Sequence, residues 1–467
     1  MELPIAFENR MKRLLGAEYA DFYHALTDEQ EVKGLRVNSK KLATEAFLQA
    51  SPFPTEPLSY VTNGFIVSEE AHAGKHPYHH AGAYYMQDPG AMATVAALPN
   101  DCLRRKNLKV LDLCAAPGGK TTQVAAQIAE RGGAVLANEY NAARSRILAG
   151  NVERMGLDNV CVTNLDSKYL AAWYPAFFDL VLVDAPCSGE GMFRKNNPAL
   201  AEWSSQNVAH CAERQAEILA NAARCVGEGG YLLYSTCTYA TEENEETVAA
   251  FLRAHPDFSL CPCAPEVVAH TANGVDVLGG MSELALCRRF YPHLSPGEGQ
   301  FAALLQRTSA PTQAVSFRDS YAPLSKADRV IAEAFLKDTV SASPTGLCYC
   351  GGLVSAFSAH DALGFPLPPF GVISVGASLG EVRKGRLVPH HHFFSAYGKD
   401  CRNQILLSPE DSLVSRYLAG EEIEAPTNVN GFSAVLLRAG DACVALGGGK
   451  SSGGKLKNYY PKGLRSR

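Results

Sequence analysis

The chain has 467 residues, of which 46% are hydrophobic and 19% are charged, and its formal net charge is -5. This length predicts two or three domains that each bury a core, and the composition excludes a disordered or fibrous protein. The sequence has no secretory signal pattern and no run of apolar residues long enough to span a bilayer. We therefore expect a cytoplasmic protein with no membrane partner. The acidic balance means that any nucleic-acid site must be a local basic patch.

Fourteen cysteines are spread along the chain. In a long intracellular protein such thiols stay reduced, which argues against a disulfide framework. The pairs Cys261 with Cys263 and Cys348 with Cys350 have one intervening residue each, which is too few for zinc ligands of the usual spacing. The sequence therefore predicts no metal site.

Residues 1–100 contain short helical patterns, a candidate strand at 34–38 and a loop-rich stretch at 71–89 that holds four histidines. From residue 101 to 308, short apolar runs alternate with longer stretches of helical periodicity. The expected strands are 108–113, 134–138, 160–164, 180–184 and 231–235, and the expected helices are 121–131, 142–155, 206–226 and 242–255. This alternation predicts a parallel α/β sheet with helices on both faces, whose ligands bind beyond the carboxyl ends of the strands.

Residues 309–328 begin with a stretch rich in Ser, Thr and Pro and are expected to form a linker. Residues 329–467 are expected to form a further domain with strands within 347–357 and 370–375. The segment 442–467 has the pair Tyr459 and Tyr460, no acidic residue and six basic ones: Lys450, Lys455, Lys457, Lys462, Arg465 and Arg467. Such a segment fits both a flexible solvated tail and an RNA-binding surface whose aromatic rings stack on bases.

The first expected strand of the α/β region leads into a loop of small residues that opens a helix. The loop consists of Cys114, Ala115, Ala116, Pro117, Gly118, Gly119 and Lys120. Small residues let a ligand approach the backbone, and the free amides of a helix N-terminus can face a polar or anionic group. A phosphate-binding P-loop needs a glycine where Cys114 stands, and a dinucleotide fingerprint needs three glycines. A tight turn without a ligand is the alternative interpretation.

Acidic residues follow three successive expected strands: Glu139, Asp166 and Asp184. In such a sheet the first can accept hydrogen bonds from ribose hydroxyls, and the second can reach an adenine edge. Each alone could be an ordinary solvated carboxylate. Together behind the glycine loop, they favour an adenosine-type cofactor.

The last two expected strands run into Asp184-Ala-Pro-Cys187-Ser-Gly and Ser-Thr-Cys237-Thr. Carbon 5 of a pyrimidine is a weak nucleophile, and a thiolate that adds at carbon 6 activates it. The reference pKa of a cysteine is ~8.5, so the site must favour the thiolate. Asp184 could hydrogen-bond ring N3 of the adduct. The alternative is that both cysteines only pack in the core.

Three of these motifs resemble those of the Nol/Nop/Sun family of RNA 5-methylcytosine methyltransferases: Leu-Asp-Leu-Cys-Ala-Ala-Pro-Gly-Gly-Lys-Thr, Val-Asp-Ala-Pro-Cys-Ser-Gly and Tyr-Ser-Thr-Cys-Thr. The resemblance extends to residues 85–89 upstream and to 379–386 and 456–461 downstream. Nearly the whole chain is similar to a bacterial branch of that family that methylates a cytosine in 16S ribosomal RNA.

The resemblance implies S-adenosyl-L-methionine as the methyl donor, without a metal. The implied cofactor-binding residues are Cys114, Ala115, Ala116, Pro117, Gly118, Gly119, Lys120, Glu139, Asp166 and Asp184. It makes Cys237 the nucleophile and Cys187 the thiol that assists release of the methylated base, with Asp184 as the third catalytic residue.

The resemblance also implies three functional parts and a partner. Residues 1–100 would form a small N-terminal α+β domain that binds RNA, 101–308 a Rossmann-like S-adenosylmethionine-dependent methyltransferase domain, and 329–467 a PUA-like RNA-binding region. The substrate would be 16S rRNA or the small ribosomal subunit, and a monomer is favoured. Arg194 and Lys195 are similar to a basic pair near the family's active site, although a solvated loop pair explains them equally well.

Other functions stay open at this point. The chain could methylate a tRNA cytosine or act as a ribosome-assembly factor without catalysis, which would tolerate loss of either cysteine. A P-loop ATPase is disfavoured by Cys114. A DNA cytosine methyltransferase would carry its nucleophile in the Pro-Cys motif and would not need Cys237.

Overall fold

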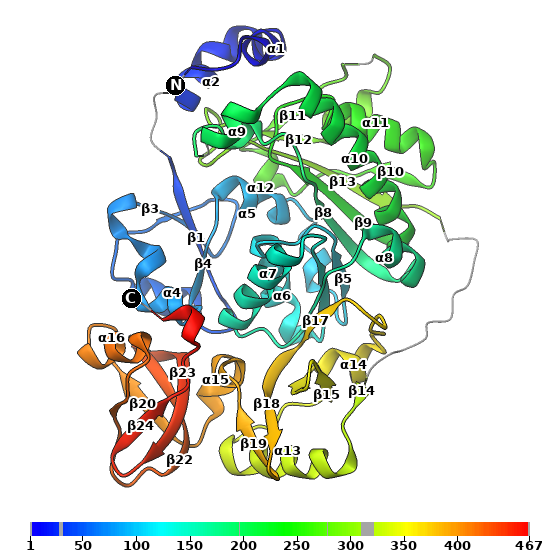
Figure 1. Cartoon of the computed structure of the whole chain (residues 1–467). Helices are drawn as coiled ribbons and strands as arrows, with labels where there is room; N and C mark the ends of the chain where they lie inside the picture. The colour runs from blue at the N-terminus through cyan, green and yellow to red at the C-terminus, as the bar shows by residue number, and fades with distance from the viewer. Residues whose placement is uncertain (1, 28–30, 196, 278, 310–321, 466–467) are drawn as a thin grey trace.

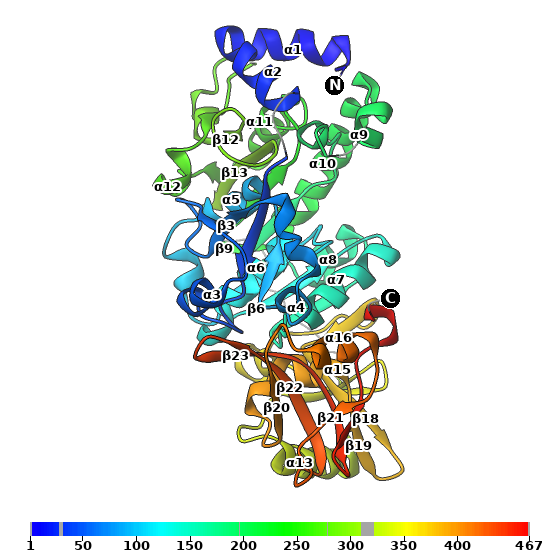
Figure 2. The same ribbon diagram turned by 90° about the vertical axis from the view of Figure 1, so that its left-hand side faces the viewer.

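A computed structural model of the chain describes residues 2–27, 31–195, 197–277, 279–309 and 322–465. Figure 1 shows a large α/β body in the middle, two N-terminal helices at one end and two small sheets at the other. The perpendicular view in Figure 2 shows the same order of parts along the long axis. No helix of the described chain is both long and apolar enough to cross a bilayer.

The N-terminal part consists of two helices followed by a small antiparallel sheet. The helices are α1 (Ile5–Leu15) and α2 (Tyr19–Thr27), and the strands are β1 (Lys33–Val37), β2 (Glu56–Pro57), β3 (Gly64–Val67) and β4 (Tyr84–Met86), with α3 (Thr44–Ala50) and α4 (Pro77–His80) between them. The predicted strand at 34–38 is confirmed as β1. Arg36 of β1 is buried and donates a hydrogen bond to Thr122 Oγ1 at 2.8 Å, which fastens this sheet to the central body.

All five strands predicted for the α/β region are present and parallel to one another. They are β5 (Lys109–Asp112), β6 (Ala134–Asn138), β7 (Val160–Thr163), β8 (Phe178–Asp184) and β9 (Val226–Thr236). The predicted helices are present as α6 (Gly119–Ile128), α7 (Ala142–Arg154), α10 (Ser205–Cys225) and α11 (Glu245–Ala254), and α5 (Pro89–Ala96) and α8 (Ser167–Trp173) join them. Apolar clusters cover both faces of the sheet, as the continuous apolar runs of its strands require.

The central sheet extends beyond these parallel strands to ten in all. On the β9 side it gains β13 (Gln300–Arg307), which is antiparallel to β9, followed by β12 (Arg288–Phe290) and β11 (Ala272–Asn273), while β10 (Phe258–Leu260) pairs with β13. On the opposite edge, β17 (Val372–Val375) pairs antiparallel with β7. The pattern predicted β17 as a strand, but not that it joins this sheet, because pairing between segments two hundred residues apart leaves no local signal.

The C-terminal part contains two further sheets of five strands each. The first consists of β14 (Ala322–Pro323), β15 (Leu347–Cys350), β16 (Leu353–Ala356), β18 (Ala377–Arg383) and β19 (Arg386–Pro389), and the second of β20 (Gln404–Leu407), β21 (Ile423–Glu424), β22 (Gly431–Ala439), β23 (Ala442–Ser452) and β24 (Lys455–Asn458). The helices are α13 (Lys326–Thr339), α14 (Ser358–Leu363), α15 (His391–Tyr397) and α16 (Ser412–Ala419). Of the predicted linker, residues 310–321 lie outside the described residues, and the domain limits stay predictions.

The basic C-terminal segment is folded up to the last described residue. Its exposed lysines Lys450, Lys455 and Lys457 lie on the antiparallel strands β23 and β24, so the flexible-tail interpretation was wrong for this part. Tyr460 is buried and its ring packs 5.6 Å from that of Tyr417, so it is not free to stack on a base as predicted. Arg467 lies outside the described residues.

One buried lysine joins three parts of the molecule. Lys41 Nζ donates hydrogen bonds to the backbone oxygen of Ala81 at 2.7 Å, to that of Arg154 on α7 at 3.0 Å and to Ser395 Oγ on α15 at 2.8 Å. Burial lowers the pKa of this ammonium group well below its usual value. Because an unpaired buried donor is costly, the three acceptors keep the N-terminal sheet, the central body and the C-terminal part together.

The histidines of α15 should make the free energy of unfolding depend on pH. Burial lowers the pKa of His391 and of His392 to about 3, so both rings are neutral in the folded protein. Unfolded histidines gain a proton near pH 6.5, so this stability is present above that pH and is lost as the pH falls. We expect the free energy of unfolding, measured in urea, to fall by about 2 kcal/mol per histidine between pH 7 and pH 5.

The variant His391→Phe should lose about 2 kcal/mol less than the parent protein over the same pH range, because one titrating ring is gone. His391 Nδ1 has no hydrogen-bond partner among the described residues, so an apolar ring costs no bond there. His210→Gln, at a solvent-exposed position of α10, serves as the control and should keep the full pH dependence. Equal pH dependence of both variants would contradict this explanation.

Candidate active site

Two cysteine thiols meet beyond the carboxyl ends of β8 and β9. These strands are parallel with Asp184 opposite Ser235, so the turns that follow them lie side by side. The sulfur atoms of Cys187 and Cys237 are 3.2 Å apart, and the backbone N–H of Cys237 donates to Cys187 Sγ at 3.3 Å. Both are free, half-buried thiols. The structure therefore brings together the two cysteines that the sequence selected.

The two thiols differ in their surroundings. The pKa of Cys187 is raised well above its usual value, because its thiol hydrogen-bonds to Cys237 and is buried, and because of the nearby Glu243 carboxylate. A raised pKa keeps the proton on Cys187 when the pair loses one proton. A thiol that keeps its proton is a weak nucleophile and can serve as a proton donor, because the reactive form of cysteine is the thiolate.

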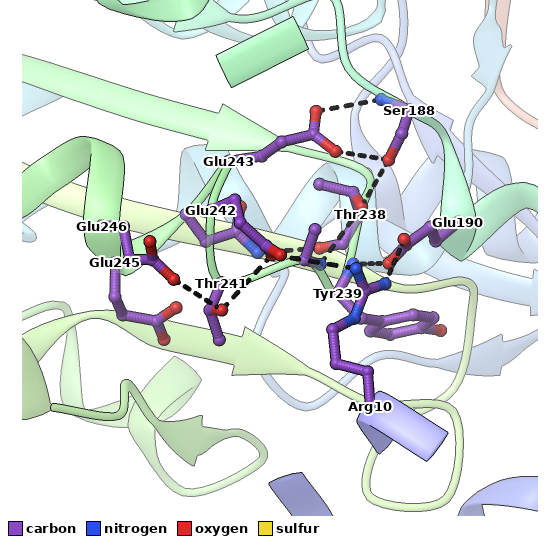
Figure 3. A network of polar contacts seen from close by, with 12 residues as sticks. Arg10, Ser188, Glu190, Thr238, Tyr239, Thr241, Glu242, Glu243, Glu245 and Glu246 are labelled. Atoms are coloured by element: carbon purple, nitrogen blue, oxygen red, sulfur yellow. Dashed lines mark hydrogen bonds and ion pairs between the residues drawn. The ribbon is translucent and has the colours of Figure 1, made fainter. Parts of the chain in front are cut away.

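A buried carboxylate connects the two cysteine turns, as Figure 3 shows. Glu243 accepts hydrogen bonds from the backbone N–H of Ser188 at 3.0 Å and from the Ser188 hydroxyl, which contacts Thr238 Oγ1 at 2.9 Å. Gln215 Nε2 of α10 donates to the same carboxylate at 2.8 Å. Ser188 follows Cys187 and Thr238 follows Cys237, so this bridge sets the distance between the turns.

A second buried carboxylate fastens the N-terminal helix to the same turns. Glu190 pairs with Arg10 of α1, accepts from Trp203 Nε1 at 2.8 Å and accepts from the backbone N–H of Tyr239 at 3.1 Å. The next residue, Gly191, donates its N–H to the backbone oxygen of Cys237 at 2.9 Å. Figure 3 shows Arg10 reaching this network from α1. Neither glutamate was selected from the sequence, because its partners come from distant segments.

The glycine loop is tied to the cysteine turns through one ion pair. Lys120 Nζ lies 2.9 Å from Asp184 Oδ2, and Ser235 Oγ donates to Asp184 Oδ1 at 2.8 Å. Lys120 is buried, whereas the side chain of Asp184 is 37% exposed and can still reach a ligand. The ion pair therefore places Asp184 between the loop after β5 and the two thiols.

A cleft of about 220 Å³ opens beside this ion pair. It is lined by Tyr85, Met86, Gln87, Asp88, Ala91, Asp112, Cys114, Ala115, Ala116, Pro117, Gly119, Lys120 and Asp184. The small-residue loop thus lines the cleft together with Tyr85 to Asp88 of the N-terminal part and Ala91 of α5. Gly118 adopts a φ of +112°, a conformation that side chains rarely tolerate, and is the N-cap residue of α6.

Asp112, at the end of β5, is a cleft residue that was not predicted from the sequence. Thr121 Oγ1 donates to its Oδ2 at 2.6 Å, whereas its buried Oδ1 has no partner among the described residues. Burial raises the pKa of this carboxyl group to about 7. The sequence signal that could have identified Asp112 is an acidic residue inside an otherwise apolar strand.

Glu139 and Asp166 lie at the ends of the next strands, outside the lining of this cleft. Glu139 is buried and accepts a hydrogen bond from the backbone N–H of Asn141 at 2.8 Å. Asp166 caps α8, accepting from the backbone N–H of Lys168 at 3.0 Å. Both side chains therefore have a local structural role, and their contact with a cofactor stays a prediction.

The pair Arg194 and Lys195 is not a solvated loop pair. Arg194 donates to the Glu298 carboxylate at 3.0 Å and to the backbone oxygen of Ala25 at 3.0 Å. Lys195 Nζ lies 3.0 Å from Asp88 Oδ2, next to the cleft. These contacts bind the loop after β8 to the N-terminal part.

The described residues contain no group of three or more His, Cys, Asp or Glu side chains that could hold a metal ion.

Asn138 lies at the end of β6, and we expect the shape of the site to depend on its buried hydrogen bonds. Its amide donates to the backbone oxygens of Leu113 at 3.2 Å and Leu165 at 2.9 Å, and its oxygen accepts from Thr163 Oγ1 at 2.9 Å. Asn138→Ala should lower the free energy of unfolding in urea by about 2 to 4 kcal/mol, because these buried groups lose their partners. Asn141→Ala, the cap of α7, should cost only about 1 kcal/mol. Similar losses for both variants would argue against this role of Asn138.

Three family models match successive parts of the chain. Residues 3–89 match the N-terminal domain of 16S rRNA methyltransferase RsmF, residues 102–306 match 16S rRNA methyltransferase RsmB/F, and residues 405–466 match the methyltransferase RsmF PUA domain. These matches confirm the predicted fold class: a methyltransferase domain with an N-terminal domain and a C-terminal PUA-like region.

Solved structures and curated proteins agree with these models. A methyltransferase homologue from Pyrococcus horikoshii is 25% identical, with a TM-score of 0.56, over 65% of this chain and 94% of that chain. NSun6 from the same organism, at 21% identity, has the same fold over 66% of this chain and 98% of its own, with a TM-score of 0.55. The ribosomal RNA small subunit methyltransferases F of Klebsiella pneumoniae and Cronobacter sakazakii are 30% and 31% identical, over 99% of this chain and 96% of their own lengths. The chain therefore belongs to the ribosomal RNA small subunit methyltransferase F family.

Proposed function

We propose that the protein transfers a methyl group from S-adenosylmethionine to carbon 5 of a cytosine in 16S ribosomal RNA, through a covalent adduct with Cys237. The observation that carries this proposal is the 3.2 Å contact between Cys237 and Cys187, next to Asp184 and the glycine-loop cleft. Membership of a family whose relatives are named for small-subunit ribosomal RNA methylation supports the choice of substrate.

The cleft fits an S-adenosylmethionine molecule in its chemistry. Its loop consists of small residues, and a Cβ at Gly119 would come within 3.3 Å of Gln87, another lining residue of the cleft. Asp112 Oδ1 is a buried acceptor without a partner among the described residues. The residues that would hold the cofactor are Cys114 to Lys120 and Asp184, with Glu139 and Asp166 at the neighbouring strand ends. When bound, S-adenosylmethionine supplies an electrophilic methyl group.

The residues of the chain then have distinct tasks. The target cytosine must leave its stack to reach the thiols. The Cys237 thiolate adds to carbon 6, which moves the electron pair of the double bond toward carbon 5 and makes that carbon nucleophilic. Asp184, held by Lys120 and Ser235, would hydrogen-bond ring N3 as that nitrogen becomes protonated.

Release of the product requires the second cysteine. The proton on carbon 5 must leave, the electron pair of that bond restores the ring double bond, and the bond from carbon 6 to Cys237 breaks with its electron pair returning to sulfur. Cys187, in contact with Cys237 Sγ, would assist this proton transfer and elimination.

The PUA-like region supplies a basic surface for the RNA partner. Lys450, Lys455 and Lys457 are exposed on adjacent strands, where they can neutralise backbone phosphates. This local patch reconciles an RNA substrate with the overall net charge of -5.

The experiment that tests this function is methyl transfer from labelled S-adenosylmethionine to small ribosomal subunits, protein-free 16S rRNA and bulk tRNA. We expect label in 16S rRNA as 5-methylcytosine at one mapped position. Label in tRNA alone would favour the alternative substrate, and no 5-methylcytosine in any of the three RNAs would contradict the proposal.

Substitutions of Cys237 and of Cys187 should have different effects on methyl transfer and on adduct formation. Cys237→Ala should lower the rate of methyl transfer by more than about a thousandfold and form no adduct, because the nucleophile is lost. Cys187→Ser should still transfer a methyl group but remain covalently bound to RNA, because release is blocked. Denaturing gel electrophoresis of protein with labelled RNA detects the adduct. An adduct in the Cys237→Ala variant would reverse the assignment of the two cysteines.

A further inference from the structure

Glu243 is a buried carboxylate whose position is unusual for a residue with only a structural role. It is fully buried, and the groups that face its oxygens all donate: the N–H and the hydroxyl of Ser188 and the side-chain amide of Gln215. Burial raises the pKa of this carboxyl group. Three donors nonetheless satisfy an acceptor-only, ionised carboxylate. A negative charge therefore lies directly behind the turn that carries Cys187.

Two contacts of Cys187 act in opposite directions. The backbone N–H of Cys237 points at Cys187 Sγ at 3.3 Å, an arrangement that favours a thiolate on Cys187. The Glu243 carboxylate disfavours a second negative charge at the same place. The hydrogen bond to Cys237 and burial are the larger causes of the raised pKa of Cys187, and the Glu243 carboxylate adds to them.

Other charged or titratable groups surround this cluster. They are Cys114 after β5, Glu190 after β8, Cys211 and Arg214 of α10, Tyr234 of β9, and the Lys120–Asp184 ion pair. Arg214 is solvent-exposed, and the ion pair has no net charge, so neither cancels the charge of Glu243. Glu243 itself accepts a hydrogen bond from the backbone N–H of Ser188, the residue that follows Cys187.

We propose that Glu243 is a positioning residue of the methyl-transfer site: it holds the Cys187 turn against the Cys237 turn and places a carboxylate beside the Cys187 turn. This inference rests on the proposed function for its catalytic consequence. Its two parts are separable. The hydrogen bonds through Ser188 to Thr238 set the spacing of the turns, and the charge adds to the causes that keep the proton on Cys187.

The test compares Glu243→Gln with the parent protein. Each cysteine is alkylated with iodoacetamide across a pH series and measured by peptide mass spectrometry, without RNA. In the parent protein Cys237 should react before Cys187 at neutral pH. In Glu243→Gln the reaction midpoint of Cys187 should move down by about one pH unit, a tenfold rise in its thiolate at a given pH. Single-turnover methyl transfer should then need a higher pH by a similar amount, because the proton moves to Cys237.

Glu245→Gln is the matched control. Glu245 is equally buried and stands two residues further along, but it pairs with Arg289 and contacts neither Ser188 nor Thr238. This variant should lose stability while both the order of alkylation and the pH profile stay as in the parent protein. If Glu243→Gln behaves like Glu245→Gln, the role of Glu243 is structural and the proposal is overturned.

Ser188→Ala keeps the proposal testable if Glu243→Gln does not fold. This variant retains the charge but removes the link to Thr238, so the order of alkylation should be unchanged while methyl transfer slows several-fold. An unchanged rate of transfer would exclude the positioning role, and faster alkylation of Cys187 in the parent protein would exclude the role of the charge. If the parent protein methylates no RNA at all, the proposed function fails, yet the alkylation order still decides the effect of Glu243 on the thiol pair.

Discussion

The contact between the sulfur atoms of Cys187 and Cys237 is the interaction on which the rest of the site depends. It exists because β8 and β9 are parallel neighbours in register, so two turns fifty residues apart in the chain leave the sheet at the same point. Covalent catalysis at a pyrimidine ring needs one thiol as nucleophile and a second group to assist release, and this contact provides both within one hydrogen-bond distance. A shift of one residue in the register would separate them.

The surrounding structure keeps this contact at the edge of the cofactor cleft. Lys120 and Asp184 connect the glycine loop to the thiol pair, while Glu243 and Glu190 hold the two turns from behind. Arg10 extends this network to the first helix. Because the N-terminal part also supplies Tyr85 to Asp88 to the lining of the cleft, the cleft is complete only when that part contacts the central body. The C-terminal part is attached separately, through Lys41 and through the pairing of β17 with β7.

Local patterns in the sequence were enough for the parallel strands, their helices and the cysteine motifs. Each of these has a short-range signal: an apolar run, a helical period, or a Gly-rich turn after a strand. The contacts that complete the site have no such short-range signal in the sequence. The bonds of Glu243 and Glu190 join segments up to 180 residues apart, and β17 joins a sheet whose other strands end before residue 308. Tyr460 was misjudged for the same reason, since its burial depends on Tyr417 and His391.

The most direct test of the account is to trap the unmodified protein on 16S rRNA that contains 5-fluorocytosine. Fluorine at carbon 5 cannot leave as a proton does, so the reaction should stop at the covalent adduct. Digestion and mass spectrometry of the trapped complex should find the nucleotide attached to Cys237. An attachment at Cys187, or no adduct on RNA that the protein methylates when fluorine is absent, would contradict the assignment of Cys237 as the nucleophile.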